Sequence, residues 1–154
     1  MTIELLPGQP IRALTLLQPW ATLVAIGAKH NETRGWSTPY RGPLAIHASK
    51  TMPAEARDFA LHNDYCRAVL NGLWGSPAQW DFPLGKVLAV CRIASCKRIT
   101  LASDLTTVDP QELAFGDYTA GRYAWALRDV RAIPPVPATG KQGLWWWQVP
   151  TDIR

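Results

Sequence analysis

The sequence predicts an α+β domain whose centre is a small closed β-barrel with two main helical insertions. Three observations predict this fold. The 154 residues are 47% hydrophobic and 18% charged, a composition typical of folded globular chains. Thirteen prolines and eleven glycines interrupt the chain at short intervals and favour many short elements over long helices. The apolar runs are short and rich in Val, Leu and Trp, and closing the sheet would hide the edges of such strands.

The expected elements can be read along the chain in order. The apolar run over residues 13–17 predicts a first strand, and Pro19 opens a short helix over residues 19–28 with Gly27 as its C-terminal signal. The Pro-rich residues 133–137 predict a stiff, extended link. The length suits one domain over residues 1–154. Further strands are expected over residues 43–48, 85–96, 123–131 and 144–149, a long helix over 53–71, and one helical turn over 110–114.

Charge and composition exclude several classes of protein. Sixteen basic residues against twelve acidic ones give a net charge of +4, which permits an anionic partner without requiring one. Three cysteines and three histidines show no spacing typical of a zinc site or a disulfide framework, so no metal and no cofactor are expected. No apolar run approaches the ~18–20 residues of a membrane span, and the N-terminus does not resemble a signal peptide. We therefore expect a cytoplasmic protein without a membrane partner.

The segment over residues 27–36 carries the most informative charges. In an extended segment, side chains two residues apart share a face, which places Glu32, Arg34 and Trp36 together with Lys29 close by. A carboxylate between two cations stays ionised and holds Arg34 as a fixed fork for a phosphate or a base edge. The alternative interpretation is a solvated cluster of surface ion pairs.

Two further segments offer groups for a site. His47 lies between apolar residues on an expected strand, where a hydrogen-bonded core histidine is more common than a base or a ligand. Ser49 shares its face, but no carboxylate that would orient the histidine can be identified, so a hydrolase triad is rejected. Glycines flank Lys141 and Gln142 and predict a tight turn that could approach a phosphate. In the run of residues 145–147, the middle tryptophan should point opposite to its neighbours, which brings at least one near the surface for base stacking.

These segments, in this order, resemble the ASCH (activating signal cointegrator homology) family of the PUA-like superfamily. The resemblance rests on residues 17–21 (LQPWA), 27–34 (GAKHNETR, a G-x-K-x-x-E-x-R pattern), 41–50, 115–125 and 140–145, and it extends over about residues 11–149. It implies a PUA-like barrel with a cleft beside the G-x-K-x-x-E-x-R loop and a role in RNA or other nucleic-acid metabolism. Carried onto this chain, the nucleic-acid-binding residues would be Lys29, Glu32, Arg34, Trp36, His47, Lys50, Tyr118, Lys141 and Gln142.

The expected function is binding of RNA or single-stranded nucleic acid, and the alternative is a hydrolase that acts on RNA or a modified nucleoside. If the chain is an enzyme, Lys29 and Glu32 would be catalytic, and a divalent metal would join them only in a nuclease. The resemblance also reaches small amidohydrolases of acetylated cytidine, which use a Thr where this chain has Glu32, so the same chemistry is disfavoured. A third interpretation is a protein-interaction module that docks a partner through the Trp-rich residues 74–80. Burial of Lys29 would favour catalysis and exposure would favour binding, and the oligomeric state stays open.

Overall fold

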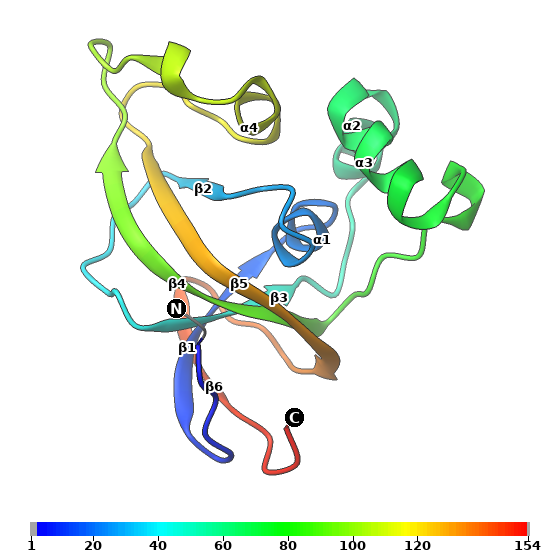
Figure 1. Cartoon of the computed structure of the whole chain (residues 1–154), viewed down its shortest axis with the longest axis vertical. Coiled ribbons are helices and arrows are strands. Elements are labelled where there is room, and N and C mark those ends of the chain that lie inside the picture. Colours follow the sequence, from blue (N-terminus) through cyan, green and yellow to red (C-terminus); the bar gives the residue numbers. More distant parts are fainter. Residues whose placement is uncertain (1–2, 154) are drawn as a thin grey trace.

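The computed structural model describes residues 3–153, which form one mixed sheet with helices at its sides (Figure 1). The strand order is β2-β5-β4-β3-β1-β6. The β1 and β3 strands are parallel, and every other neighbouring pair is antiparallel. The strands are β1 (Pro10–Leu16), β2 (Asn31–Arg34), β3 (Pro43–Ala48), β4 (Lys86–Arg98), β5 (Tyr123–Pro137) and β6 (Leu144–Gln148).

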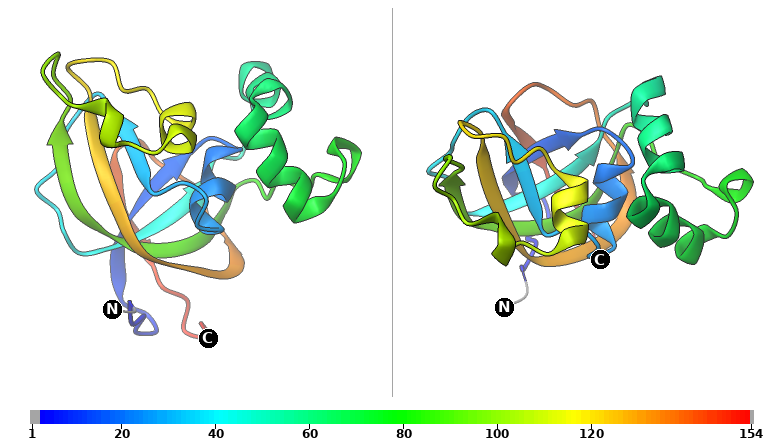
Figure 2. Two further views of the ribbon diagram at one scale, coloured as in Figure 1. Left: turned by 45° about the horizontal axis from the view of Figure 1, so that its top comes forward. Right: turned by 90° about the horizontal axis from the view of Figure 1, so that it is seen from above.

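The α+β class is confirmed, but the closed barrel is not. The β2 and β6 strands are the two edges of the sheet, and no ladder joins them in the described part of the chain. The sheet nevertheless curls, because the long strands β4 and β5 pair through several register shifts, and such bulges bend and twist a strand. Figure 2 shows the two strands bending around α1 (Trp20–Ala25). The Pro-rich residues 133–137, expected as a link, continue β5.

The expected long helix over residues 53–71 is two helices. The first is α2 (Ala54–His62), and the second is α3 (Asp64–Trp74). Asn63 breaks the helix with an extended conformation, and its side chain accepts a hydrogen bond from the backbone N–H of Cys66, which caps α3. The last helix, α4 (Pro110–Phe115), lies where one helical turn was expected. Short 3-10 turns occupy Pro77–Gln79 (η1) and Leu105–Thr107 (η2).

The main core lies between the curled sheet and α1. Trp125 of β5 is fully buried there, and its indole N–H donates to the Trp36 carbonyl oxygen at 3.2 Å. A second cluster joins α1 to the α2 and α3 helices, where the half-buried Trp20 ring stacks on Phe59 at 4.9 Å between centroids. Within residues 3–153, none of the helices is long and apolar enough to cross a membrane. This packing holds α2 and α3 against α1.

Candidate functional site

The Lys29 side chain turns into the protein just after α1. The backbone reverses at Gly27, whose φ of +80° is the left-handed conformation that glycine adopts without strain. The ammonium group is fully buried, donates to the Phe115 carbonyl oxygen at 3.1 Å, and lies 3.9 Å from Glu32 Oε1. Burial lowers the pKa of Lys29, and the nearby carboxylates of Glu32 and Glu112 oppose this effect only in part.

Glu32 and Arg34 form a tight ion pair on β2. Arg34 donates to Glu32 Oε2 from Nε at 3.2 Å and from Nη2 at 3.1 Å, and Nη2 also donates to the Thr15 carbonyl oxygen of β1 at 2.9 Å. Arg34 Nη1 has no hydrogen-bond partner among residues 3–153. The guanidinium is therefore fixed in orientation and retains donors for a ligand. The distances confirm that Lys29, Glu32 and Arg34 gather in one place.

Glu112 of α4 is a buried support for this loop that sequence reasoning missed. Its carboxylate accepts hydrogen bonds from the backbone N–H groups of His30 and Asn31, and the second of these is 3.2 Å long. On the same helix, the Gln111 amide donates to the Ala28 carbonyl oxygen at 3.0 Å. These contacts hold the start of β2 against α4. The residues involved are about eighty positions apart, so no local pattern could have found them.

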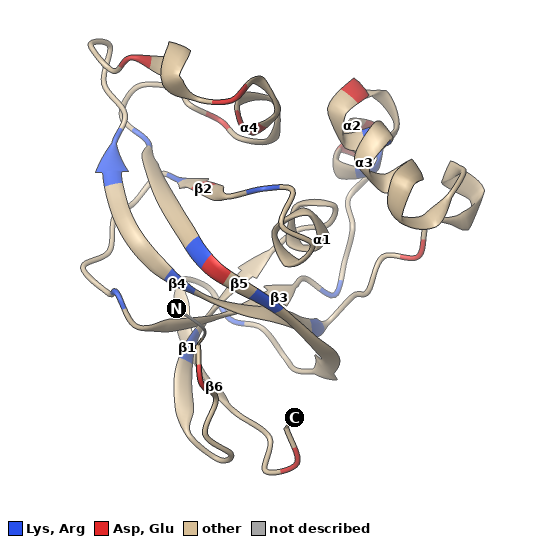
Figure 3. Ribbon diagram, in the orientation of Figure 1, with Lys and Arg blue, Asp and Glu red and all other residues tan. Residues whose placement is uncertain are grey.

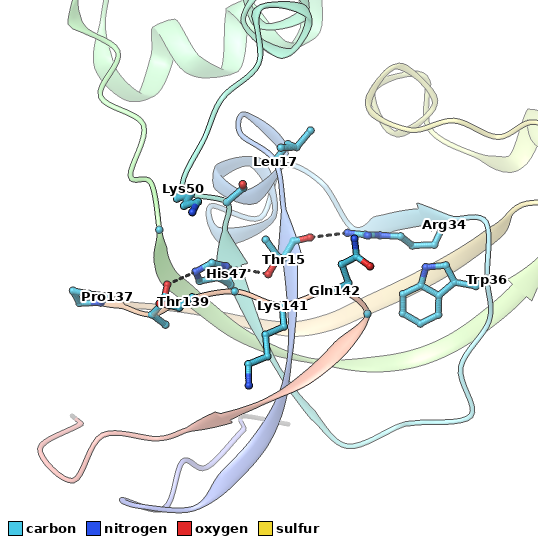
Figure 4. A pocket seen from close by; sticks show the side chains of 15 residues that line it. Thr15, Leu17, Arg34, Trp36, His47, Lys50, Pro137, Thr139, Lys141 and Gln142 are labelled. Carbon is cyan, nitrogen blue, oxygen red and sulfur yellow. Dashed lines mark hydrogen bonds between the residues drawn. The ribbon is translucent and has the colours of Figure 1, made fainter.

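A wide pocket, which we call the basic groove, opens beside Arg34. Its volume is about 1120 Å³, and it is lined by the ends of β1, β2 and β3 and by residues 137–143. Figure 4 shows Arg34 and Trp36 at one end, Lys50 at the other, and Gln142 between them. Three of its fifteen lining residues are cations, Arg34, Lys50 and Lys141, and none is acidic. The basic groove is therefore electrostatically suited to an anion.

His47 forms the floor of the basic groove as part of a hydrogen-bonded chain. Trp145 Nε1 donates to Thr15 Oγ1 at 3.0 Å, the Thr15 hydroxyl contacts His47 Nδ1 at 3.0 Å, and His47 Nε2 contacts the Ala138 carbonyl oxygen at 2.8 Å. A carbonyl only accepts, so His47 carries its proton on Nε2 and Nδ1 accepts from Thr15. Burial lowers the pKa of His47, which keeps the ring neutral. The expectation of a hydrogen-bonded core histidine is confirmed.

A second, smaller pocket, which we call the aromatic pocket, lies on the other side of Arg34. Its volume is about 490 Å³, and it lies between α1, α2, β2 and the end of α4. The stacked rings of Trp20 and Phe59 line it. Its other lining residues include two acids, Glu32 and Asp117, and the cations Arg34 and Arg122. Figure 3 shows acidic positions along the α4 segment, whereas the strands carry mostly basic ones.

Most of the predicted site residues line these two pockets. Neither Lys29, which is buried behind Glu32, nor Tyr118 lines them. The Tyr118 hydroxyl accepts from the Asn31 amide at 3.3 Å, and burial raises its pKa. Glu32 lines the aromatic pocket. The basic groove receives Arg34, Trp36, His47, Lys50, Lys141 and Gln142.

The tryptophan run alternates as predicted. Trp145 and Trp147 are buried, whereas Trp146 is 57% exposed. The guanidinium of Arg12 lies 3.9 Å from the centre of the Trp146 ring, and neither residue lines the basic groove or the aromatic pocket. The exposed tryptophan is therefore held by a cation–π contact outside the candidate site. Among residues 3–153, no group of three His, Cys, Asp or Glu side chains could hold a metal ion.

Fold and site together define a small α+β domain in which an open, curled sheet carries a basic groove at a G-x-K-x-x-E-x-R loop. The model of the ASCH domain family matches residues 14–137, and the chain belongs to this family. Activating signal cointegrator 1 of Homo sapiens and of Mus musculus are each 33% identical over 85 residues, which cover 54% of this chain and 14% of those proteins. The match therefore spans a small part of these relatives.

Solved structures agree with the fold. The crystal structure of ASCH from Zymomonas mobilis superposes with a TM-score of 0.56 at 15% identity, covering 88% of this chain and 86% of that one. The structures of two single-residue variants of the same protein superpose with TM-scores of 0.53. At this identity the likeness supports the fold alone.

Proposed function

We propose that this chain binds RNA or another single-stranded nucleic acid in the basic groove. One observation carries the proposal: the cations Arg34, Lys50 and Lys141 line a groove of about 1120 Å³ that has no acidic lining residue. Phosphates supply most of the sequence-independent affinity for nucleic acids, and cations along a groove track the backbone. Family membership supports the same class of ligand.

The basic groove also offers a surface for a base. Trp36 is 37% exposed and packs edge-on against Trp125, with ring centroids 4.8 Å apart. The indole N–H of Trp125 also donates to the Trp36 carbonyl oxygen, so the buried Trp125 holds the exposed ring in a fixed position. Stacking of one base on an aromatic ring contributes about 1–3 kcal/mol and tolerates any sequence. Cations and a fixed ring within one groove favour a single strand over a duplex, whose bases are already stacked.

Burial of Lys29 is the observation that favours the hydrolase alternative. A buried lysine with a lowered pKa is typical of catalytic sites. In this chain, however, the ammonium group has no exposed surface, donates to the Phe115 carbonyl oxygen and lines neither pocket. A catalytic group must reach the reacting atoms. We therefore assign Lys29 the role of supporting Glu32 and Arg34, and binding is the better supported function.

Titration of a fluorescently labelled single-stranded RNA over a salt series tests the proposal. Counterion release contributes a slope of log K against log salt of about −0.7 per phosphate contact, so one contact from each of the three lining cations predicts about −2. Lys141→Ala should reduce the magnitude of the slope by about 0.7 and weaken all sequences alike. Lys97→Ala on β4 is the matched control, because Lys97 is exposed and lines neither pocket. An affinity that salt does not change, or an equal effect of both substitutions, would contradict the proposal.

A further inference from the structure

We propose that the aromatic pocket takes up one unpaired nucleobase of the strand whose phosphates lie in the basic groove. The inference rests on the proposed function and adds to it a second subsite with a different ligand group. The volume of about 490 Å³ is in the range of pockets that enclose a single small ligand, so it suits one nucleoside unit.

The wall of the aromatic pocket is a stacking platform. The rings of Trp20 on α1 and Phe59 on α2 have centroids 4.9 Å apart and planes inclined by 28°. Both side chains are half-buried, and both line the pocket. A nucleobase has a π-face of the same kind and can extend such a stack. An aliphatic wall would accept any apolar group, whereas a stacked pair favours a flat aromatic one.

The charges of the two pockets separate a phosphate from a base. Arg34 lines both pockets and is paired with Glu32 at 3.1 Å. The basic groove adds two further cations, Lys50 and Lys141, and no acid, whereas the aromatic pocket adds Arg122 together with the acids Glu32 and Asp117. Carboxylates beside the site repel a phosphate, but they accept hydrogen bonds from the amino and imino groups of a neutral base. Arg122 is held in place by donation to the carbonyl oxygens of Asp117 and Thr33, at 3.1 Å each. The aromatic pocket therefore presents fixed donors and acceptors suited to a base edge.

Arg34 connects the two pockets. Thr15, Leu17 and Arg34 line both of them, so one nucleotide can reach from the groove into the pocket. The Arg34 guanidinium is anchored by Glu32 and the Thr15 carbonyl oxygen, and its Nη1 group has no partner among the described residues. A phosphate on the groove side and a base edge on the pocket side are both acceptors for its donors. This position makes Arg34 the residue that couples backbone binding to base selection.

The test compares a single-stranded RNA with an abasic oligonucleotide of the same length and backbone charge, together with 5′-mononucleotides and ribose 5-phosphate. Four proteins are measured by equilibrium titration: the parent, Phe59→Leu, Tyr65→Leu and Lys141→Ala. Phe59→Leu keeps an apolar side chain but removes the ring from the aromatic pocket. Tyr65 is the matched control, because it is an exposed aromatic residue on α3 that lines neither pocket. Circular dichroism and urea unfolding check that each variant is folded.

One base in the aromatic pocket should contribute about 5- to 150-fold to the preference of the parent for the base-containing RNA over the abasic oligonucleotide, and a base stacked on Trp36 adds to this preference. Phe59→Leu should lower the ratio of the two affinities by about the share of the aromatic pocket, whereas Tyr65→Leu should keep the ratio and Lys141→Ala should weaken both ligands alike. An equal, salt-dependent affinity of the parent for both oligonucleotides, or a ratio unchanged in Phe59→Leu, would overturn the base subsite and leave the proposed function standing. A third outcome is that no oligonucleotide binds, but that 5′-mononucleotides bind more tightly than ribose 5-phosphate and lose this preference in Phe59→Leu. This outcome would retain the base subsite and overturn the proposed function. Absence of all binding would overturn both.

Discussion

Glu32→Gln should destabilise the protein more than Lys29→Met, although Lys29 is the more deeply buried of the two residues. Glutamine keeps the shape of Glu32 but removes the one charge that faces two cations, Lys29 at 3.9 Å and Arg34 at 3.1 Å. Methionine at position 29 removes one cation, and the carboxylate keeps Arg34, whose Nε and Nη2 both donate to Glu32 Oε2. The two substitutions break the same pair but leave different groups behind.

The magnitudes follow from the geometry. At an effective dielectric constant of about 20, two unit charges about 4 Å apart attract by roughly 4 kcal/mol. Glu32→Gln removes this attraction from a fully buried ammonium group, and loss of one partner of a buried pair costs about 3–5 kcal/mol. Lys29→Met removes the same attraction, but it also removes the cost of taking the ammonium group out of water, and the two changes offset each other. The remaining cost is the Phe115 carbonyl oxygen without its donor, about 1–3 kcal/mol.

Urea unfolding of the parent, both single variants and the double variant measures these penalties and the coupling between the two residues. The pH dependence gives an independent check. Burial lowers the pKa of Lys29 below its ordinary value of 10.5, and loss of the Glu32 charge lowers it further. The folded Glu32→Gln variant then holds fewer protons at alkaline pH than its unfolded chain, so its unfolding free energy rises with pH. Its penalty should shrink as the pH rises towards 10.5, the ordinary pKa of a lysine.

Two results would refute this reasoning. The first is a Glu32→Gln penalty at pH 7 that is no larger than that of Lys29→Met. The second is a Glu32→Gln penalty that stays constant as the pH rises to 10.5, the ordinary pKa of a lysine. Either would show that Lys29 and Glu32 do not act as a buried pair that supports Arg34.

The remaining predictions concern the core, the groove and the thiols. Trp125→Ala should cost about 3–5 kcal/mol, seen as a lower urea midpoint, because the ring is fully buried; an unchanged midpoint would contradict its core position. Gly140→Ala should cost about 1–3 kcal/mol and weaken RNA binding, because a Cβ atom there would lie 2.6 Å from Thr15 Oγ1. Gly72→Ala, with open space around it on α3, should instead be neutral or stabilising in the same unfolding assay. A thiol reagent at about pH 8 should label only Cys96 rapidly by mass spectrometry, because burial raises the pKa of the other two thiols to about 12; fast labelling of all three would contradict their burial.

Local patterns in the sequence predicted the parts of the fold that depend on local geometry. The alternation of an extended chain correctly placed Glu32 beside Arg34 and separated Trp146 from its two neighbours. The break between α2 and α3 was missed, although Asn63 is a preferred N-cap residue, because the apolar spacing continues across it. Hydrophobic periodicity predicts which face of a helix is apolar, but it does not predict where one helix ends and a second, N-capped helix begins.

The parts that could not be predicted depend on contacts between distant segments. The buried Lys29 ammonium group needs the Phe115 carbonyl oxygen as its acceptor. The backbone N–H of the neighbouring residue, His30, needs the carboxylate of Glu112, which lies 82 residues further along the chain. The aromatic pocket requires that Phe59 of α2 stack on Trp20 of α1. Nothing in the spacing of either segment indicates the other. The sequence thus identified the charged loop but not whether its lysine points towards solvent or away from it.

The incomplete closure of the sheet accounts for the place where the two candidate pockets meet, which is Arg34. The β6 strand covers the outer edge of β1 only from Pro10 to Leu14, and at Thr15 that edge has no strand partner within the described residues. A backbone carbonyl without a ladder partner needs another donor, and Arg34 of β2 supplies it at 2.9 Å. A side chain thus bridges β2 to β1 just beyond the end of the ladder between β1 and β6. Both pockets open at this bridge, because Thr15 and Arg34 line each of them. A closed ladder at this point would have consumed the polar groups and the space that the proposed nucleic-acid site uses.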